Sequence, residues 1–257
     1  MRRMKMWKNV GSMAAVLAIV LILPNTSQKV AAAMQQIPVL GDFFKVVTVR
    51  EYQVDGERNM ADVKVPEVSV DDGITSEEGE DASVGQAKET AEAINFDIQQ
   101  VTNQLIEEFE STMEEYGDEG YQDLFIDSNV LTDNDRWFAL ELILYQGAGS
   151  GYERHRHYTI DKTTGKRAAL SDFYGEDYIA TISEQVKTQM REQMAADENI
   201  HYWVDEKDVP EWNFQAIKED QDFYINPDGH VVICFDEYEV APGYMGCVEF
   251  ELAETIE

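Results

Sequence analysis

Apolar residues recur at helical spacing in two stretches of the chain. The first stripe steps by four, three, four and four residues: Ile94, Ile98, Val101, Leu105 and Phe109. It predicts a helix over about residues 86–116, which Gly117 and Gly120 end. The second stripe predicts a helix over about residues 176–196 and consists of Ile179, Ile182, Val186 and Met190.

Alternating or continuous apolar runs between turn signals predict the strands. They cover residues 121–132, 136–147, 154–161, 230–240 and 246–252. The turns that separate them are Asp133-Asn134-Asp135, "KTTGK" around Gly165, and Asn226-Pro227-Asp228-Gly229. Two helices and about six strands without a βαβ alternation predict an α+β domain over residues 85–253. In this domain an antiparallel sheet packs against the two helices.

The N-terminus has the three-part layout of an export signal. A basic segment, residues 1–9, precedes an apolar run from Val10 to Leu23, and the small residues Ala31-Ala32-Ala33 follow. As a helix the run would rise about 21 Å, less than the ~30 Å hydrocarbon core, but its flanks can extend it. We therefore expect residues 10–33 to be a signal-anchor or transmembrane segment.

This layout fixes the expected topology. Residues 1–9 stay in the cytoplasm and everything after residue 34 lies outside. Signal peptidase is expected to cut between Ala33 and Met34, with Ala31 and Ala33 in its two small-residue pockets. Residues 34–61 form a juxtamembrane segment that lies at the membrane surface or begins as a strand. Residues 62–84 are acidic and lack aromatic residues, so we expect a mobile tether.

The negative net charge limits the classes of macromolecule that the chain can bind. The chain has 257 residues and a formal net charge of −31. After residue 30 come all 51 acidic residues but only 15 basic ones, a net charge of −36. Such a surface excludes nucleic acid as a partner. It either steers a basic protein partner or only keeps an exported domain soluble. Of the two cysteines, Cys234 and Cys247, the sequence favours buried free thiols over a disulfide.

Motifs for catalysis or metal binding are weak. His155 and His157 form H-x-H, two thirds of a zinc site, but Arg154 and Arg156 flank them and the other histidines have no ligand spacing. We therefore expect polar side chains on an exposed strand face, with no metal and no cofactor. The chain has no nucleophile elbow, Cys/His signature or phosphate loop. This favours a binding domain over an enzyme.

Two loops have side chains of a size that is unusual for a solvated turn: the first has large apolar ones and the second has mostly small ones. In "FDEYEVAPGYMG", residues 235–246, Pro242 and Gly243 suit the central positions of a type II turn. Tyr244 and Met245 follow, and they either fold back as a small apolar cluster or anchor a protein partner. In the other loop Ser150, Gly151 and Tyr152 follow a strand. The small residues there leave room for the surface of a partner.

Several segments resemble the extracellular domain of bacterial anti-sigma-V factors. They are "AAAMQQIPVLGDFFKVVTV", "IDKTTGK…LSDFYGEDYI", "QVKTQMREQM" and "DFYINPDGHVVICFDEYEVAPGYMG". The resemblance runs to about Leu252 and is weakest over the acidic tether and the first helix. A related domain also occurs appended to some peptidoglycan deacetylases.

The resemblance implies a single-pass membrane receptor whose outer domain binds lysozyme, here through the two loops. Binding exposes the cleavage site to signal peptidase, an intramembrane protease cuts next, and a sigma factor is freed. Residues 1–9 are shorter than the cytoplasmic segment with which family members hold the sigma factor. Either translation starts upstream of Met1 or the sigma-binding segment is lost. A secreted or anchored wall-binding or lysozyme-blocking module without signalling output is the alternative function.

Overall fold

The computed structural model describes residues 20–22, 43–71, 82–117 and 120–256. Within them two sheets and three α-helices form a mixed α+β fold, which confirms the predicted class. The larger sheet contains, in spatial order, β1 (Val20–Ile22), β2 (Phe44–Asp55), β3 (Asn59–Val70), β4 (Gln122–Asp133), β5 (Trp137–Gly147), β6 (Gly151–Asp161) and β7 (Lys166–Arg167).

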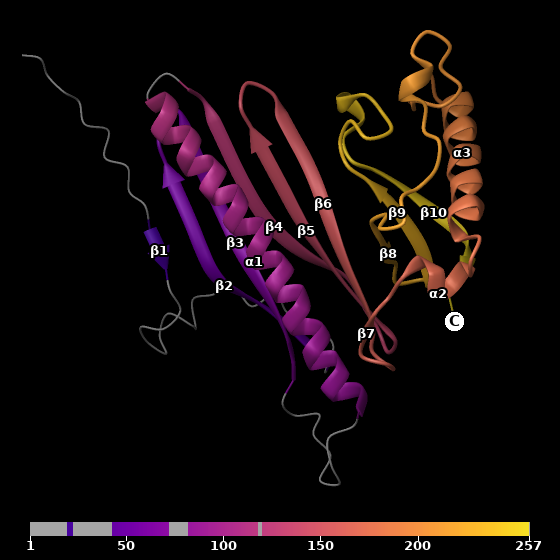
Figure 1. Ribbon diagram of the computed structural model, residues 1–257, viewed down its shortest axis with the longest axis horizontal. Helices are drawn as coiled ribbons and strands as arrows, with labels where there is room; N and C mark the ends of the chain where they lie inside the picture. Colours follow the sequence, from indigo (N-terminus) through magenta and orange to yellow (C-terminus); the bar gives the residue numbers. More distant parts are fainter. Residues whose placement is uncertain (1–19, 23–42, 72–81, 118–119, 257) are drawn as a thin grey trace, which may run out of the picture.

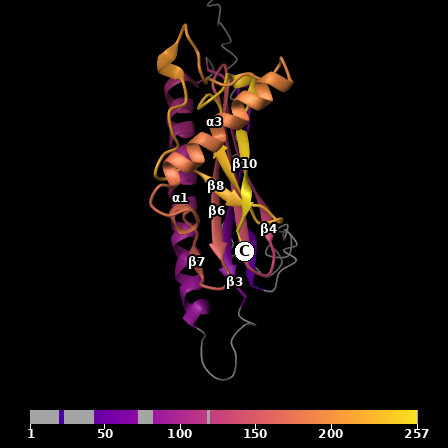
Figure 2. The same cartoon turned by 90° about the vertical axis from the view of Figure 1, so that its right-hand side faces the viewer.

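The smaller sheet and two helices form the C-terminal part. Its elements are α2 (Leu170–Tyr174), α3 (Tyr178–Ala196), β8 (Phe223–Ile225), β9 (His230–Phe235) and β10 (Val248–Thr255), with 3₁₀ turns at Pro210–Trp212 and Gly243–Met245. The small sheet lies beside β6, and α3 covers its outer side (Figures 1 and 2).

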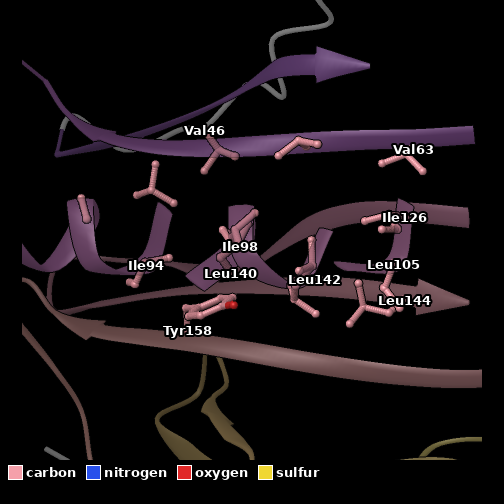
Figure 3. Close-up of a cluster of buried hydrophobic side chains, with 14 of the residues drawn as sticks. Val46, Val63, Ile94, Ile98, Leu105, Ile126, Leu140, Leu142, Leu144 and Tyr158 are labelled. Atoms are coloured by element: carbon pink, nitrogen blue, oxygen red, sulfur yellow. The ribbon is translucent and has the colours of Figure 1, made fainter. Parts of the chain in front are cut away.

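Helix α1 (Ala82–Tyr116) packs in the larger sheet's hydrophobic core. All five residues of its predicted stripe are buried. Figure 3 shows stripe residues Ile94, Ile98 and Leu105 between Val46 and Val63 on one side and Leu140, Leu142 and Tyr158 on the other. Alternation along β5 and β6 then turns Glu141 and His157 to the opposite face, where the small sheet packs.

The predicted tether is wrong over residues 62–70, because these residues belong to β3. Ala61, Val63 and Val65 are buried, while the charged residues Asp62 and Lys64 occupy the positions between them. The acidity of the stretch hid this period-two pattern. The folded domain therefore includes residues 44–70 and does not begin at residue 85. Residues 72–81 lie outside the described part of the chain.

One strand pair is parallel, although no βαβ unit was predicted. β3 and β4 run parallel over Asn59–Val63 and Gln122–Ile126, and α1 connects them. Such a connection needs a long crossover, which the 35-residue helix supplies. The other pairs in both sheets are antiparallel.

The apolar run expected to be a helix contains β1, whose residues Val20–Ile22 pair with the edge of β2. An edge strand offers unpaired backbone groups, and two of the three residues are β-branched, which favours pairing as a strand. The rest of residues 1–33 lies outside the described part. No helix among the described residues is long and apolar enough to cross a membrane.

Candidate functional site

The two loops singled out by the sequence lie at the same end of the molecule. The turn between β5 and β6 covers residues 148–150, and the connection between β9 and β10 covers residues 236–247. Both occur at the end where β6 begins and β9 finishes (Figure 1). The predicted contact residues of the two loops therefore share one end: Ser150, Gly151, Tyr152, Pro242, Gly243, Tyr244 and Met245.

Tyr238 joins the two loops. Its ring stacks on that of Tyr152, with centroids 6.4 Å apart and planes 30° apart. It also lies against Gly243, where an added Cβ would come within 2.3 Å of the Tyr238 ring. The alternation through "FDEYEV" predicts a strand up to residue 240, but β9 ends at Phe235 and Tyr238 has a left-handed φ of 65°. No feature of the sequence therefore predicted the role of this residue.

The chain after β9 is fastened to β6 by hydrogen bonds. Glu153 N–H donates to Glu237 Oε2 at 2.9 Å, and Glu237 N–H donates to the Glu153 carbonyl at 3.3 Å. His155 N–H donates to Asp236 Oδ1 at 3.0 Å. β7 pairs with β6 only at Ile160 and Asp161, so the backbone groups at the start of β6 need these partners. The two loops are therefore held as one unit.

The predicted type II turn at Pro242 and Gly243 is wrong. Pro242 has φ −61° and ψ 150° and precedes the 3₁₀ turn Gly243–Met245. The left-handed glycine is Gly246, with φ 66°. Gly243 is required instead because the Tyr238 ring occupies the space of a side chain.

Tyr244 and Met245 have different environments. They therefore neither both fold back as an apolar cluster nor both lie exposed as anchors for a partner. Tyr244 is 70% exposed, the highest value among the exposed large hydrophobic residues that the structure describes. Met245 is partly buried against the core of the C-terminal part. We call the exposed set Tyr152, Tyr238 and Tyr244 the tyrosine surface; Tyr152 and Tyr238 are 38% and 49% exposed.

Carboxylates outnumber cations beside the tyrosine surface. Glu153 lies near the start of β6, and Asp236, Glu237 and Glu239 lie in the connection between β9 and β10. The cations next to them are Arg154, whose guanidinium lies 5.5 Å from the Tyr152 ring centroid, and Lys218, which binds Glu239 Oε1 at 2.5 Å. Burial raises the pKa of Asp236, and burial together with Asp236 raises the pKa of Tyr152. The surface thus combines exposed aromatic rings with a negative surround.

A second polar cluster lies between the sheets and departs from the exposed strand face expected for H-x-H. His157 is fully buried, with Nδ1 2.6 Å from Asp222 Oδ2. Glu141 Oε1 lies 3.1 Å from His155 Nδ1 and 3.5 Å from His157 Nε2. Burial alone lowers the pKa of His157, but hydrogen bonds with Asp222, Cys234 and Glu141 raise it to about 12. Although burial raises the pKa of Glu141, the two histidines hold it well below its usual range.

Both cysteines are free thiols, the state that the sequence favours. Cys234 is buried and Cys247 is half-buried. The β9–β10 register places Glu249 opposite Cys234, so Cys247 is not its cross-strand partner. Cys247 Sγ instead donates to the Glu153 carbonyl at 3.5 Å. The expected cleavage residues Ala31, Ala33 and Met34 lie outside the described part of the chain.

Comparison with solved structures defines the fold class. A DUF3298 family protein from Pseudomonas aeruginosa PAO1 and a DUF3298 family member from Bacteroides fragilis NCTC 9343 have TM-scores of 0.52 and 0.50, both at 14% identity. The matches cover 81% of this chain and 88% and 89% of the other two. Residues 171–253 also match the family described as "Protein of unknown function (DUF3298)".

A curated relative is much more similar in sequence. Anti-sigma-V factor RsiV of Bacillus subtilis (strain 168) is 33% identical over 253 residues, which cover 98% of this chain and 82% of RsiV. The chain therefore belongs to the anti-sigma-V factor family, as its resemblance to the extracellular domain of that family implied.

Proposed function

We propose that this chain is a regulatory protein, an anti-sigma factor anchored in the membrane, whose outer domain senses lysozyme. Its relation to RsiV supports the anti-sigma role. The observation that carries the sensing role is the tyrosine surface, where Tyr244 is 70% exposed at the tip of two loops that Tyr238 ties together. Tyrosine is enriched at interface hot spots, because its ring gives a large contact area at low entropic cost.

Charge supports lysozyme as the ligand. Lysozyme of the animal type is strongly basic, and Glu153, Asp236, Glu237 and Glu239 lie in or next to the loops that carry the tyrosine surface. Complementary charge speeds the encounter and fixes its orientation more than it adds affinity. The exposed rings would then supply the binding energy, while the carboxylates would speed and orient the approach of lysozyme.

The proposed output is cleavage between Ala33 and Met34 by signal peptidase, followed by a cut within the membrane that releases the sigma factor. The first cut would lie ten residues before β2, which begins at Phe44. Phe44 is fully buried and its ring lies 4.8 Å from that of Phe138. We propose that the cut is gated by how far residues 37–49 are freed when lysozyme binds.

The test measures release of the outer domain from cells that make the full chain. Lysozyme added below its lytic dose should release a fragment whose N-terminus, mapped by mass spectrometry, is Met34. Ala33→Trp should stop release without changing lysozyme binding, because only the protease pocket rejects the larger side chain.

Three results would contradict the proposal. They are rapid release without lysozyme, a fragment that begins elsewhere, and lysozyme binding that never leads to release. The last result would favour a wall-binding or lysozyme-blocking module without signalling. Hydrolysis or deacetylation of peptidoglycan by the purified chain would show an enzyme instead.

A further inference from the structure

Two cross-strand pairs face each other where the sheets meet. In the larger sheet Glu141 of β5 lies opposite His157 of β6. In the smaller sheet Cys234 of β9 lies opposite Glu249 of β10. One ligand atom each of His157, Cys234 and Glu249 lies within 4.8 Å of the other two, and the same holds for Glu141, His155 and His157. His157 is therefore common to both groups.

The second ring nitrogen of His157, Nε2, is placed where it could bind a metal ion. The side chain is 0% exposed, and its Nδ1 is engaged by Asp222 Oδ2 at 2.6 Å. Its Nε2 is buried and makes no well-formed hydrogen bond among the described residues, although Glu141 Oε1 lies 3.5 Å from it. A carboxylate on one ring nitrogen fixes the orientation of a metal-binding histidine and leaves the other nitrogen as the ligand.

The two carboxylates of the cluster are oriented in the same manner. Tyr224 Oη donates to Glu249 Oε2 at 3.1 Å, and Asn129 Nδ2 donates to Glu141 Oε2 at 2.9 Å. Each contact holds one oxygen and leaves the other to face the cluster. Supporting contacts of this kind are typical of a metal site and are more than an acidic surface requires.

The flanking arginines have partners of their own, which weakens the opposition to a cation that the sequence suggests. Arg156 pairs with Asp97 of α1 at 3.2 Å, and Arg154 donates to Gln146 at 3.1 Å. Alternation along β6 places these side chains on the face opposite His157. A cavity of about 610 Å³ reaches His157 and Cys234, and its lining includes the carboxylates of Asp220 and Asp222 as well as the cations of Arg156, Arg167 and Lys218.

We propose that His157, Cys234 and Glu249 bind one divalent transition metal of the zinc class. Imidazole, thiolate and carboxylate together are ligands that zinc accepts, whereas magnesium and calcium select oxygen alone. The ion would link the two sheets, because His157 comes from one and Cys234 and Glu249 come from the other. Binding requires the Cys234 thiolate and an unprotonated His157 Nε2, so the thiol proton and the imidazolium proton are both released to solvent as the metal–sulfur and metal–nitrogen bonds form.

The test titrates the purified full chain, reduced and metal-free, with Zn²⁺ in competition with a chromophoric chelator. We expect one equivalent to bind with a submicromolar Kd. Co²⁺ in place of Zn²⁺ should give the near-ultraviolet charge-transfer band of a thiolate ligand. Cys234→Ser should abolish that band and weaken Zn²⁺ binding at least tenfold, and Asp222→Asn should weaken it about tenfold or more.

Cys247→Ser is the matched control, because it removes the other thiol and should leave both readouts unchanged. Thermal melts show whether each variant is folded. If Cys234→Ser does not fold, Glu249→Gln replaces it, since Glu249 is exposed. The proposal is overturned if the wild type binds no Zn²⁺ tightly or if Cys247→Ser loses as much binding as Cys234→Ser. It is also overturned if Zn²⁺ binding survives Cys234→Ser, Asp222→Asn and Glu249→Gln. The cluster would then be only a hydrogen-bonded contact between the two sheets.

Discussion

Gly243 lies under the ring of Tyr238, which ties the two loops of the tyrosine surface together. An alanine Cβ would come within 2.3 Å of that ring, so Gly243→Ala should push it off Tyr152. The free energy of unfolding should fall by about 1 kcal/mol, the lower end of the overpacking range, because a half-exposed ring can move. Hydrogen exchange should rise at the amides of Glu153 and Glu237, which bond across the loops.

Gly85→Ala is the control for this substitution. A Cβ at Gly85 meets nothing within 4 Å, and the residue lies in α1, where alanine is favoured over glycine by about 1 kcal/mol. Its loop amides should exchange as in the wild type. Equal loop exchange in the two variants would mean that Tyr238 does not couple the loops.

At the scale of the elements, β3 depends on α1 beyond the end of its pairing with β4. That pairing stops at Val63, and farther along the strand Asn95 of α1 bonds both backbone groups of Val68 at 2.8 Å. Asn95→Ala would leave both groups without this partner and should lower the free energy of unfolding by about 1–3 kcal/mol. Urea unfolding measures this as a lower midpoint at constant slope.

Gln104→Ala is the matched control on the same helix. Its amide bonds only the exposed Glu108 carboxylate, at 2.8 Å, so its loss should cost less than about 0.5 kcal/mol. If Asn95→Ala lowered the free energy of unfolding as little as Gln104→Ala, solvent would satisfy the backbone groups of Val68. β3 would then not depend on α1 at this position.

Periodicity predicted α1 and α3 well, because one buried face leaves a clear pattern, whereas the five-residue helix α2 was not predicted. Helix α3 begins at Tyr178, two residues after the predicted start, and α1 begins at Ala82, four residues before it. β3 was missed because Asp62, Lys64 and Glu67 occupy its less buried positions and resemble a solvated tether. Without β3 the parallel crossover to β4 could not be predicted, because one of its two strands was absent.

The sites were predictable only where the residues of a site are neighbours in sequence. Local sequence identified the loops of Tyr152 and Tyr244, but not Tyr238, whose left-handed backbone follows an apparently continuous strand. The cluster around His157 needed tertiary structure, because Cys234 and Glu249 come from the other sheet. H-x-H was its sole sequence signal.

At the scale of the whole molecule, the formal net charge of −31 sets how a basic ligand approaches. Many of the 51 acidic residues serve solubility, but those in the two loops lie beside the exposed rings. Salt screens the long-range attraction, with a Debye length of about 8 Å at physiological ionic strength. Higher salt should therefore slow association of lysozyme more than it changes dissociation.

The central claim is that the tyrosine surface binds lysozyme, and calorimetric titration of Tyr244→Ala tests it most directly. Phe96→Ala is the control, since Phe96 is 63% exposed and lies on α1, outside both loops. Tyr244→Ala should weaken binding by about 2 kcal/mol, roughly 30-fold in Kd, while Phe96→Ala binds like the wild type and both melt normally. Wild-type affinity in Tyr244→Ala, or a loss that only follows unfolding, would contradict the claim.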